Sequence, residues 1–456
     1  MKSILKSFFY IFIAASGLLA PRILSAQNAD SAARSRALDS LLQWHANDAS
    51  LHARPITFKE FLETVIANNL DYAVQKYNIS IAQAQIVVAK VYPEPSISFG
   101  VSKDITPGFS TSDSLGGNTY SVSASQTILL GGKIGKGVAV AEENKSVAEA
   151  QTEEFFWSLR ANAAQAYEAA DIADSTYVAN LRTYVNLAQL AQVNEHRVGA
   201  GDLGKIDFIQ SRVDAIQARG AVLQADAARR QAFIALAHFM GKRNSDTLYR
   251  PAGSLILPKH AFNLDTLITR AKESRSDLIA AKHQAESARL GIDLAHALRW
   301  PDLTVGVGYT TIASTPILGP FAFQRLLGVN LSFPIPISAA INRGSLDVAE
   351  NTYEQSRYSV ASLELSVETS VRQAFAQYEL AREQYEQYSA DLLSDAKKVR
   401  DARLYSYKAG SASLLDVLTA ENTLAAINLA YYNALSGYAN ALISLEQAAE
   451  IWDISY

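Results

Sequence analysis

Four short segments of the chain alternate between apolar and small polar residues with a period of two. They cover residues of about 96–106, 118–130, 302–312 and 325–335. In the first segment, Ile97, Phe99 and Val101 alternate with serine and glycine. A period of two places the apolar side chains on one face of a β-strand and the small polar side chains on the other. We therefore predict four strands, each with one apolar and one polar face.

Two much longer segments contain neither glycine nor proline and are rich in alanine, glutamine, glutamate, leucine and arginine. They run over residues 138–198 and 345–409. These residue types favour helix, and at 1.5 Å per residue each segment could form a helix of about 90–100 Å. Helices of that length are typical of coiled-coil packing. A soluble spectrin-like bundle would explain these helices alone, but it would not explain the strands between them.

The chain repeats its pattern after about 208 residues, which is a sign of internal duplication. Val91–Ser98 resembles Arg299–Gly306, and Gly201–Phe208 resembles Gly410–Val417. Each half runs helix, strand, loop, strand, long helix, turn and helix. We expect one architecture of two pseudo-equivalent repeats, with the boundaries 56–240 for the first repeat, 241–265 for a linker, 266–450 for the second repeat and 451–456 for a C-terminal tail.

The N-terminus predicts export. Residues 1–26 combine a basic start, an apolar stretch and a cleavage point after Ala26, as in a signal peptide, and residues 27–55 form an N-terminal extension. The formal net charge is −4, and residues 1–26 hold three basic residues and no acids, so the mature charge is about −7. This balance argues against a nucleic-acid partner. The chain has no cysteine, which excludes disulfides and a lipid anchor on cysteine.

In an exported protein, the four alternating segments match the pattern of outer-membrane strands, whose apolar face meets lipid. A half-buried soluble sheet gives the same alternation in any single strand. Aromatic residues near the segments are candidates for membrane-interface anchors, namely Tyr120, Tyr309, Phe109 and Phe321. Open sheet edges cannot face lipid, and a barrel needs about eight strands to close. Two copies would give eight strands and three would give twelve, with room for a pore; we favour three.

Several motifs resemble those of a known family. Tyr407–Ala420 reads Tyr-x-x-Gly-x-x-Ser-x-Leu-Asp-Val-Leu-x-Ala and is the most specific of them. The others are Ile56–Leu62, the prolines that open two strands at Pro93 and Pro301, and the Leu-x-Gly-Gly-Lys turn at Leu129–Lys133. In their order, spacing and duplication they resemble the outer membrane factors, the TolC-like outer membrane efflux protein family, over roughly residues 56–450.

The resemblance implies a mainly α fold with a membrane β-barrel portion: a long α-helical coiled-coil tunnel in the periplasm and four strands per chain in a homotrimeric twelve-stranded barrel. It implies a mixed belt at residues 241–265. It also implies a passive export conduit for small molecules in the outer membrane of a Gram-negative cell. The partners would be outer-membrane lipid, a periplasmic adaptor (membrane fusion protein) and an inner-membrane transporter, in a tripartite efflux pump of the RND/MFP type or a type I secretion system.

The two glycine-led turns are expected at the periplasmic tips of the helical hairpins, where the resemblance implies adaptor docking. They contain Gly199, Gly201, Gly410 and Ser411. Glycine allows the tight reversal between antiparallel helices. Asp202 and either Ser411 or Ser413 are candidates to cap the helices that follow.

The resemblance also implies a gate at the tunnel entrance. Asp416 would form a ring of three carboxylates, which favours cations, and the Tyr407 hydroxyl would bond the Asp207 carboxylate. Thr419 and Ala412 stand where some relatives have a second acid and a basic latch, which indicates a thinner ring and a looser gate. The plain alternative is that Asp207 and Asp416 are first-turn acids that stabilise helix N-termini; the two interpretations can coexist.

The sequence gives no sign of an enzyme. Its seven histidines are scattered, and it has no His-Glu-x-x-His, Gly-x-Ser-x-Gly or phosphate-binding glycine motif. We therefore expect no catalytic site, no cofactor and no metal site. The alternative to a channel is an exported coiled-coil structural or adaptor protein. The sequence does not specify the cargo, the adaptor or the resting state of the gate.

Overall fold

The computed structural model describes residues 53–103, 114–115, 118–243, 247–253, 262–316, 322–335, 343–388 and 390–452. The predicted signal peptide and the candidate anchors Phe109 and Phe321 lie outside the described residues. The chain divides into two compact units. The described part of the first unit comprises residues 53–61, 165–253 and 381–439, and that of the second comprises residues 62–164, 262–380 and 440–452. No helix of the described ranges is both long enough and apolar enough to cross a membrane.

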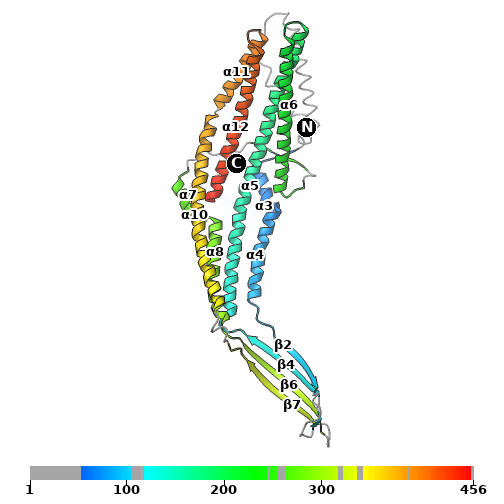
Figure 1. Cartoon of the computed structure of the whole chain (residues 1–456), viewed down its shortest axis with the longest axis vertical. Helices are drawn as coiled ribbons and strands as arrows, with labels where there is room; N and C mark the ends of the chain where they lie inside the picture. The colour runs from blue at the N-terminus through cyan, green and yellow to red at the C-terminus, as the bar shows by residue number, and fades with distance from the viewer. Residues whose placement is uncertain are drawn as a thin grey trace. The chain divides into compact units, whose positions relative to one another are not determined.

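The second unit contains an antiparallel sheet in the order β2-β4-β6-β7 (Figure 1). Its strands are β2 (Ser96–Lys103), β4 (Asn118–Ile128), β6 (Leu303–Pro316) and β7 (Ala322–Ser332). All four predicted strands are confirmed. The short strand β3 (Ser114–Leu115) pairs with the end of β6. The connection from β6 to β7 is shorter than the alternation predicted, because pairing continues to Ser314 opposite Ala322.

The register of the sheet joins like residues across all four strands. One row is apolar and consists of Phe99, Val122, Tyr309 and Leu327. The next row is small and polar and consists of Ser98, Ser123, Gly308 and Gly328. Directly paired residues share a face of an antiparallel sheet, and successive residues point to opposite faces. The sheet therefore has one apolar face and one face of small residues, as the sequence predicted.

Helices of the second unit pack along the first part of α5 (Lys133–Gly199), a single helix about 100 Å long. Helices α4 (Leu70–Ala89) and α8 (Ser276–Leu298) contact α5 directly. Helix α7 (Leu264–Ser274) contacts α10 (Gly344–Gln387), where Lys272 pairs with Glu368. Polar contacts fix their register: His283 Nδ1 of α8 lies 2.6 Å from Glu143 Oε1, and Thr152 Oγ1 donates to the Gln75 carbonyl of α4. The side chain of Asn69 caps α4 by accepting from the Tyr72 N–H.

The first unit contains two helical hairpins. The first is α5 with α6 (Lys205–Phe239), and the second is α11 (Ala390–Lys408) with α12 (Leu414–Ala449). Their buried side chains form one core near the turns, made of Leu187, Leu190, Ala215, Tyr407, Leu414, Val417 and Leu418. Both halves follow the order helix, strand, strand, helix and helix, with α3 (Phe58–Asn68) and α4 opening the first half and α7 and α8 the second. In the second half the first of the long helices is divided into α10 and α11.

Two short strands in the first unit were not predicted. β1 (Arg54–Ile56) pairs in parallel with β5 (Tyr249–Pro251), which lies in the segment expected to form a mixed belt. The Tyr167 hydroxyl donates to the Ile56 carbonyl at 2.9 Å and accepts from the Ala252 N–H at 3.2 Å. A three-residue strand is too short to show alternation, so its pairing comes from this tertiary contact.

The prediction of one unbroken helix over residues 345–409 was wrong. Helix α10 ends at Gln387, and α11 begins at Ala390. The Tyr388 N–H donates to the Tyr385 carbonyl, a tightened last turn. The Tyr385 ring stacks on Tyr438 of α12 with centroids 5.4 Å apart and an interplanar angle of 3°. The break therefore coincides with aromatic packing between helices, which no glycine or proline marks in the sequence.

Candidate functional site

Each hairpin turns on a glycine in the left-handed region. Gly201 has φ +81° and Gly410 has φ +77°. The Asp202 N–H donates to the Arg197 carbonyl and the Gly201 N–H to the Val198 carbonyl, and the same pair of bonds recurs around Gly410, where Ser411 N–H donates to Ser406. This is the Schellman arrangement that ends a helix. Gly199 is the last residue of α5, and its φ is not positive.

Asp416 lies in the first turn of α12, which begins at Leu414, and helps to cap that helix. Its Oδ2 accepts from the Ser413 N–H at 3.0 Å and from Ser413 Oγ at 2.8 Å, while the Asp416 N–H donates to Ser413 Oγ at 3.2 Å. This reciprocal arrangement is a capping box. The hydrogen bonds from Ser413 hold the pKa of Asp416 below its usual value. The capping interpretation of Asp416 is confirmed. Of the two serines considered as caps after the second turn, Ser413 caps α12. The carboxyl is exposed, and its lowered pKa favours the ionised form.

Asp207 lies in the first turn of α6, where Gly204 is the N-cap residue and supplies no side-chain cap. The prediction that Asp202 caps this helix was therefore wrong. A Cβ added to Gly204 would lie 3.5 Å from Asp207 Oδ2, so the carboxylate folds back over the start of its own helix. A negative charge there is favourable because the N-terminus of a helix carries a partial positive charge.

Tyr407 is buried where α11 meets α5. Its hydroxyl donates to Oδ1 of Asn194 at 2.7 Å, and the Arg197 guanidinium lies 5.1 Å from the centre of its ring. Burial raises the pKa of Tyr407; the Arg197 charge opposes that rise and the Asp207 charge adds to it. Asp207 is therefore near enough to act on the hydroxyl electrostatically, but the described contact of that hydroxyl is with Asn194. A direct Asp207–Tyr407 bond stays a prediction.

Sequence reasoning missed Asn194. It is fully buried, and no motif of the sequence analysis includes it. The available signal was its spacing: Asn194 lies seven residues after Leu187 on the face that carries the core of α5. A polar residue in such a stripe calls for a partner from another helix.

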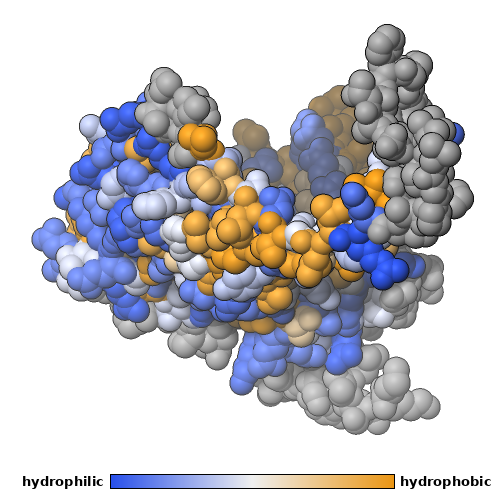
Figure 2. Space-filling model, turned by 90° about the horizontal axis from the view of Figure 1, so that it is seen from below, coloured by the Kyte–Doolittle hydropathy of each residue, from blue (hydrophilic) through white to orange (hydrophobic). Residues whose placement is uncertain are grey.

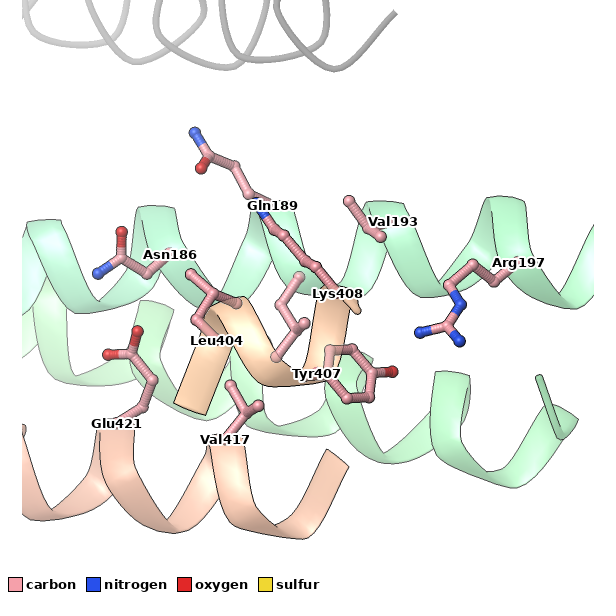
Figure 3. Close-up of a pocket in the computed structure, with 10 residues that line it drawn as sticks. Asn186, Gln189, Val193, Arg197, Leu404, Tyr407, Lys408, Val417 and Glu421 are labelled. Carbon is pink, nitrogen blue, oxygen red and sulfur yellow. The ribbon is translucent and has the colours of Figure 1, made fainter. Parts of the chain in front are cut away.

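A pocket of about 130 Å³ opens beside this hydrogen bond (Figure 3). Its walls come from α5, α11 and α12. At one end, Glu421 Oε1 accepts from Arg400 Nη1 at 3.0 Å, and Glu421 is only 3% exposed. Burial raises the pKa of Glu421, while the charge of Arg400 and hydrogen bonds from Arg400 and the nearby Asn186 oppose the rise. Sequence reasoning did not identify this pocket.

The sheet of the second unit exposes its apolar face. Phe99 is 80% exposed and Leu327 is 77% exposed. The apolar side chains seen in Figure 2 gather into a continuous patch rather than lying scattered. Tyr120 lies opposite Val101, and Tyr309 lies opposite Val122 and Leu327, near the middle of β6. Tyr120 is 49% exposed and Tyr309 is 41% exposed. Their role as interface anchors stays a prediction.

The strand-to-helix turn between β4 and α5 brings together two motifs that the sequence analysis had treated separately. Lys133 Nζ lies 2.6 Å from Asp302 Oδ1, and the Leu130 N–H donates to the same oxygen at 3.2 Å. Gly131 has φ +73°, and a Cβ there would lie 3.0 Å from Trp300 Cδ1. The Gly-Gly-Lys turn of the first repeat is thus built around the Trp-Pro-Asp segment of the second.

In the ranges that the structure describes, no group of three or more histidine, cysteine, aspartate or glutamate side chains is placed to hold a metal ion. What the described residues offer instead is a lipid-compatible sheet face and a pair of hairpin tips with an ionised carboxylate.

Comparisons with known proteins agree with this arrangement. The model of a family described as outer membrane efflux protein matches residues 61–242 and 267–449, once for each half. No curated protein sequence matches the chain.

Solved structures share the fold over most of the chain. The CmeC outer membrane channel of Campylobacter jejuni is 18% identical and superposes with a TM-score of 0.70, covering 86% of this chain and 85% of that one. The open state of the Neisseria gonorrhoeae MtrE outer membrane channel is 19% identical, with a TM-score of 0.67 and coverage of 88% and 90%. CusC is 18% identical, with a TM-score of 0.69 and coverage of 87% and 93%. At these identities the likeness is one of fold.

Proposed function

Because this chain belongs to the outer membrane efflux protein family, we propose that it is a passive outer-membrane conduit through which small molecules leave the cell. Three copies would close a twelve-stranded barrel, and their hairpins would form a periplasmic tunnel. A periplasmic adaptor and an inner-membrane transporter would supply the cargo and the energy, in a tripartite efflux pump or a type I secretion system. Outer-membrane lipid would surround the barrel.

The observation that carries this proposal is the two-faced sheet. Its apolar row of Phe99, Val122, Tyr309 and Leu327 alternates with a row of serine and glycine. In a barrel, the apolar face would meet lipid and the small polar face would line a water-filled lumen. The edge strands β2 and β7 each have one neighbour in the sheet. Unpaired edges are not tolerated in lipid, so pairing β7 of one copy with β2 of the next supports a closed ring of chains.

The alternative, an exported coiled-coil structural protein, would also use the long helices. It has no use for four strands that expose large apolar side chains on one face. Soluble proteins rarely leave so continuous an apolar surface uncovered. The sheet therefore favours the channel.

A pair of charge substitutions at neighbouring positions tests the proposal. Val122→Arg places a cation on the apolar face, and Ser123→Arg places the same cation on the small polar face, one residue away on β4. An arginine near the middle of a membrane strand costs about 2–4 kcal/mol on the lipid side. Val122→Arg should strongly reduce the heat-modifiable, detergent-extractable form in outer membranes, while Ser123→Arg should leave most of it. Equal tolerance of both substitutions would count against membrane insertion and for the structural protein.

Residues at the hairpin tips extend the proposal to the entrance. Asp416 would form a ring of three carboxylates in the trimer and favour cations. The tip residues Gly199, Gly201, Gly410 and Ser411 would contact the adaptor. The exposed, ionised state of Asp416 supports this role. Asp207 would add negative charge near the same entrance.

A further inference from the structure

Helix α4 carries an apolar stripe on its exposed side. The residues of this α4 stripe follow the alternating three- and four-residue spacing of a coiled-coil seam, and they are Leu70, Val74, Tyr77, Ile81, Ala84 and Val88. All six are exposed, and the five larger side chains are each at least 55% exposed. Ala82 and Ile86 of the same helix are buried in the second unit. Because a helix that is apolar on more than one face is normally covered on each of them, α4 calls for a second partner.

Helix α10 also exposes apolar side chains on the face opposite to its packed one. Val348, Tyr358 and Leu365 are each at least 68% exposed. Leu346 lies two residues before the first of them and Val367 two residues after the last, and both are buried. Residues two positions apart point about 200° apart around a helix. The α10 stripe therefore consists of these three apolar residues, and small or polar residues lie between them, namely Asn351, Gln355 and Ser362.

The sheet connects these two helices to its opposite edges (Figure 1). Helix α4 leads into β2, and α10 follows β7. Helices α5 and α8, which belong to the inner strands β4 and β6, already contact each other within the chain through His283 and Glu143. When β7 of one copy pairs with β2 of the next, as in the proposed channel, α10 of the first copy comes to run beside α4 of the second. The two stripes thus belong to helices that a ring of copies would bring together.

Contacts within the second unit fix the relative heights of α4 and α10. Thr152 of α5 donates to the carbonyl of Gln75 in α4 at 3.3 Å. Glu154, two residues further along α5, is within electrostatic reach of Arg275, whose guanidinium donates to Ser370 Oγ of α10 at 3.0 Å. Gln75 and Ser370 therefore lie at nearly the same height along α5. Since α4 runs toward the sheet and α10 away from it, the two helices are antiparallel.

This height relationship matches residues of complementary size. Copies in a ring are related by rotation about an axis along the tunnel, so residues of equal height face each other. Counted toward the sheet from Gln75 and Ser370, Tyr77 comes level with Leu365, and Ala84 with Tyr358, to within about one helical turn. A small residue thus faces a large one, which is how packed helices interdigitate.

We propose that α4 of each copy packs antiparallel against α10 of the next, with Tyr77 beside Leu365 and Ala84 beside Tyr358 of that next copy. This interface rests on the proposed channel function, because it needs a closed ring of copies. Both halves of the interface are present on one chain, so a second copy covers both stripes at once. A periplasmic adaptor is the competing occupant, and it would have to cover the two stripes separately.

Cysteine pairs test the interface in the full-length protein, because the chain has no cysteine of its own. Two pairs are matched in height: Tyr77→Cys with Leu365→Cys, and Ala84→Cys with Tyr358→Cys. A third, Leu70→Cys with Tyr358→Cys, lies on the same stripes but differs in height by about 15 residues, or about 22 Å. After a short bifunctional maleimide acts on isolated outer membranes, a denaturing gel should show covalent dimers and trimers for both matched pairs and only monomer for the third.

Every substituted side chain is exposed in the chain, so the variants should fold. Three results would overturn the proposal. The matched pairs could link only within one chain and stay at the mobility of the monomer, they could link to a protein of another mass, or the mismatched pair could link as well as they do.

A charge exchange provides a second measurement, the fraction of trimer in detergent. Tyr77→Glu or Leu365→Lys alone places an unpaired charge in an apolar interface and should lower that fraction, because an unpaired buried charge is unfavourable. The two together place opposite charges across the interface and should recover much of the trimer. Gln83→Glu, an exposed position of α4 outside the stripe, should leave the trimer unchanged. Losses that simply add in the double variant would count against contact between Tyr77 and Leu365.

Cross-linking does not depend on conductance, so the interface and the channel can fail separately. Matched pairs that link neighbouring copies of a protein that never conducts in a bilayer would refute the proposed function and keep the interface. A protein that conducts although neither matched pair links would refute the interface and keep the function.

Discussion

The hydroxyl of Tyr407 donates a hydrogen bond of 2.7 Å to Oδ1 of Asn194, a residue 213 positions earlier in the chain. Both side chains are buried, and Asn194 has no exposed surface at all. The bond joins α11 of the second hairpin to α5 of the first, close to the turns of both. We interpret it as a buried polar contact that, together with the shared apolar core, holds the two hairpins together in this structure.

Tyr407→Phe removes this bond and leaves the Asn194 amide buried without it. The loss should cost about 1–3 kcal/mol, the usual penalty for an unsatisfied buried polar group. We expect a lower melting temperature in detergent and longer channel openings. Asp207→Asn is the matched comparison: it should have the smaller effect on both quantities, because the hydroxyl contacts Asn194 rather than Asp207. The opposite ranking would restore the Asp207–Tyr407 pair as the latch.

Substitutions at Asp416 and Ser413 distinguish the effect of the charge at the hairpin tip from the effect of the helix cap. Ser413→Ala removes the hydroxyl that donates to Asp416 and accepts from its N–H, at a cost of about 1 kcal/mol, and keeps the carboxylate. Asp416→Asn removes the charge and keeps an oxygen that can accept from Ser413. Cation selectivity, measured as a reversal potential in a salt gradient, should fall in Asp416→Asn and persist in Ser413→Ala. Loss of selectivity in Ser413→Ala alone would point to helix distortion instead.

Gly131 and Gly132 offer a matched pair of backbone tests. Both have positive φ, +73° and +72°, but only Gly131 lies against Trp300. An alanine in the left-handed region costs about 1–2 kcal/mol, and Gly131→Ala must in addition displace the indole ring. Gly131→Ala should therefore lower the melting temperature further than Gly132→Ala does. Equal shifts would mean that the contact with Trp300 carries no constraint.

Glu168 makes the stability of the first unit depend on pH. It is 3% exposed, and its contact in this unit is Ser436 Oγ at 3.4 Å. Burial raises the pKa of Glu168 to about 8 from its usual 4.5; the Ser436 bond opposes the rise, and the Asp171 charge adds to it. The folded protein therefore binds this proton more tightly than the unfolded chain does. The contribution of Glu168 to the free energy of unfolding should be greatest below pH 4.5 and should be lost as the pH rises to about 8.

Between pH 4.5 and about 8, the free energy of unfolding should fall by at most about 1.4 kcal/mol per pH unit because of Glu168. Glu168→Gln imitates the protonated carboxyl and should flatten this part of the stability profile, measured as melting temperature against pH. Glu195→Gln, an exposed acid on the same helix, should leave the profile unchanged. A Glu168→Gln profile parallel to that of the wild type would show that the carboxyl is ionised in the folded protein.

The parts of the fold that follow from local pattern could be predicted. Alternation identified β2, β4, β6 and β7 because each strand carries its apolar side chains on one face. The glycines at 201 and 410 marked the turns because the backbone there needs positive φ. Ser413 and Asp416 have the spacing of a capping box, so their contact was within reach of the sequence as well.

The parts that depend on tertiary contact could not be predicted. The break at residue 388 coincides with the stacking of Tyr385 on Tyr438, and the Tyr167 hydroxyl bonds the β1 residue Ile56 and Ala252, next to β5. The contact of Tyr407 with the buried Asn194 was not predicted, and the Asp207–Tyr407 pair stays a prediction. Each of these contacts joins residues far apart in the chain, where spacing carries no information.

The most direct test of the channel is the single-channel conductance of the purified, detergent-extracted wild-type protein in a planar bilayer. The account predicts discrete, cation-selective steps, small while the Tyr407–Asn194 bond keeps the tip closed. A preparation that is folded by its melting curve but produces no steps in the bilayer would contradict it.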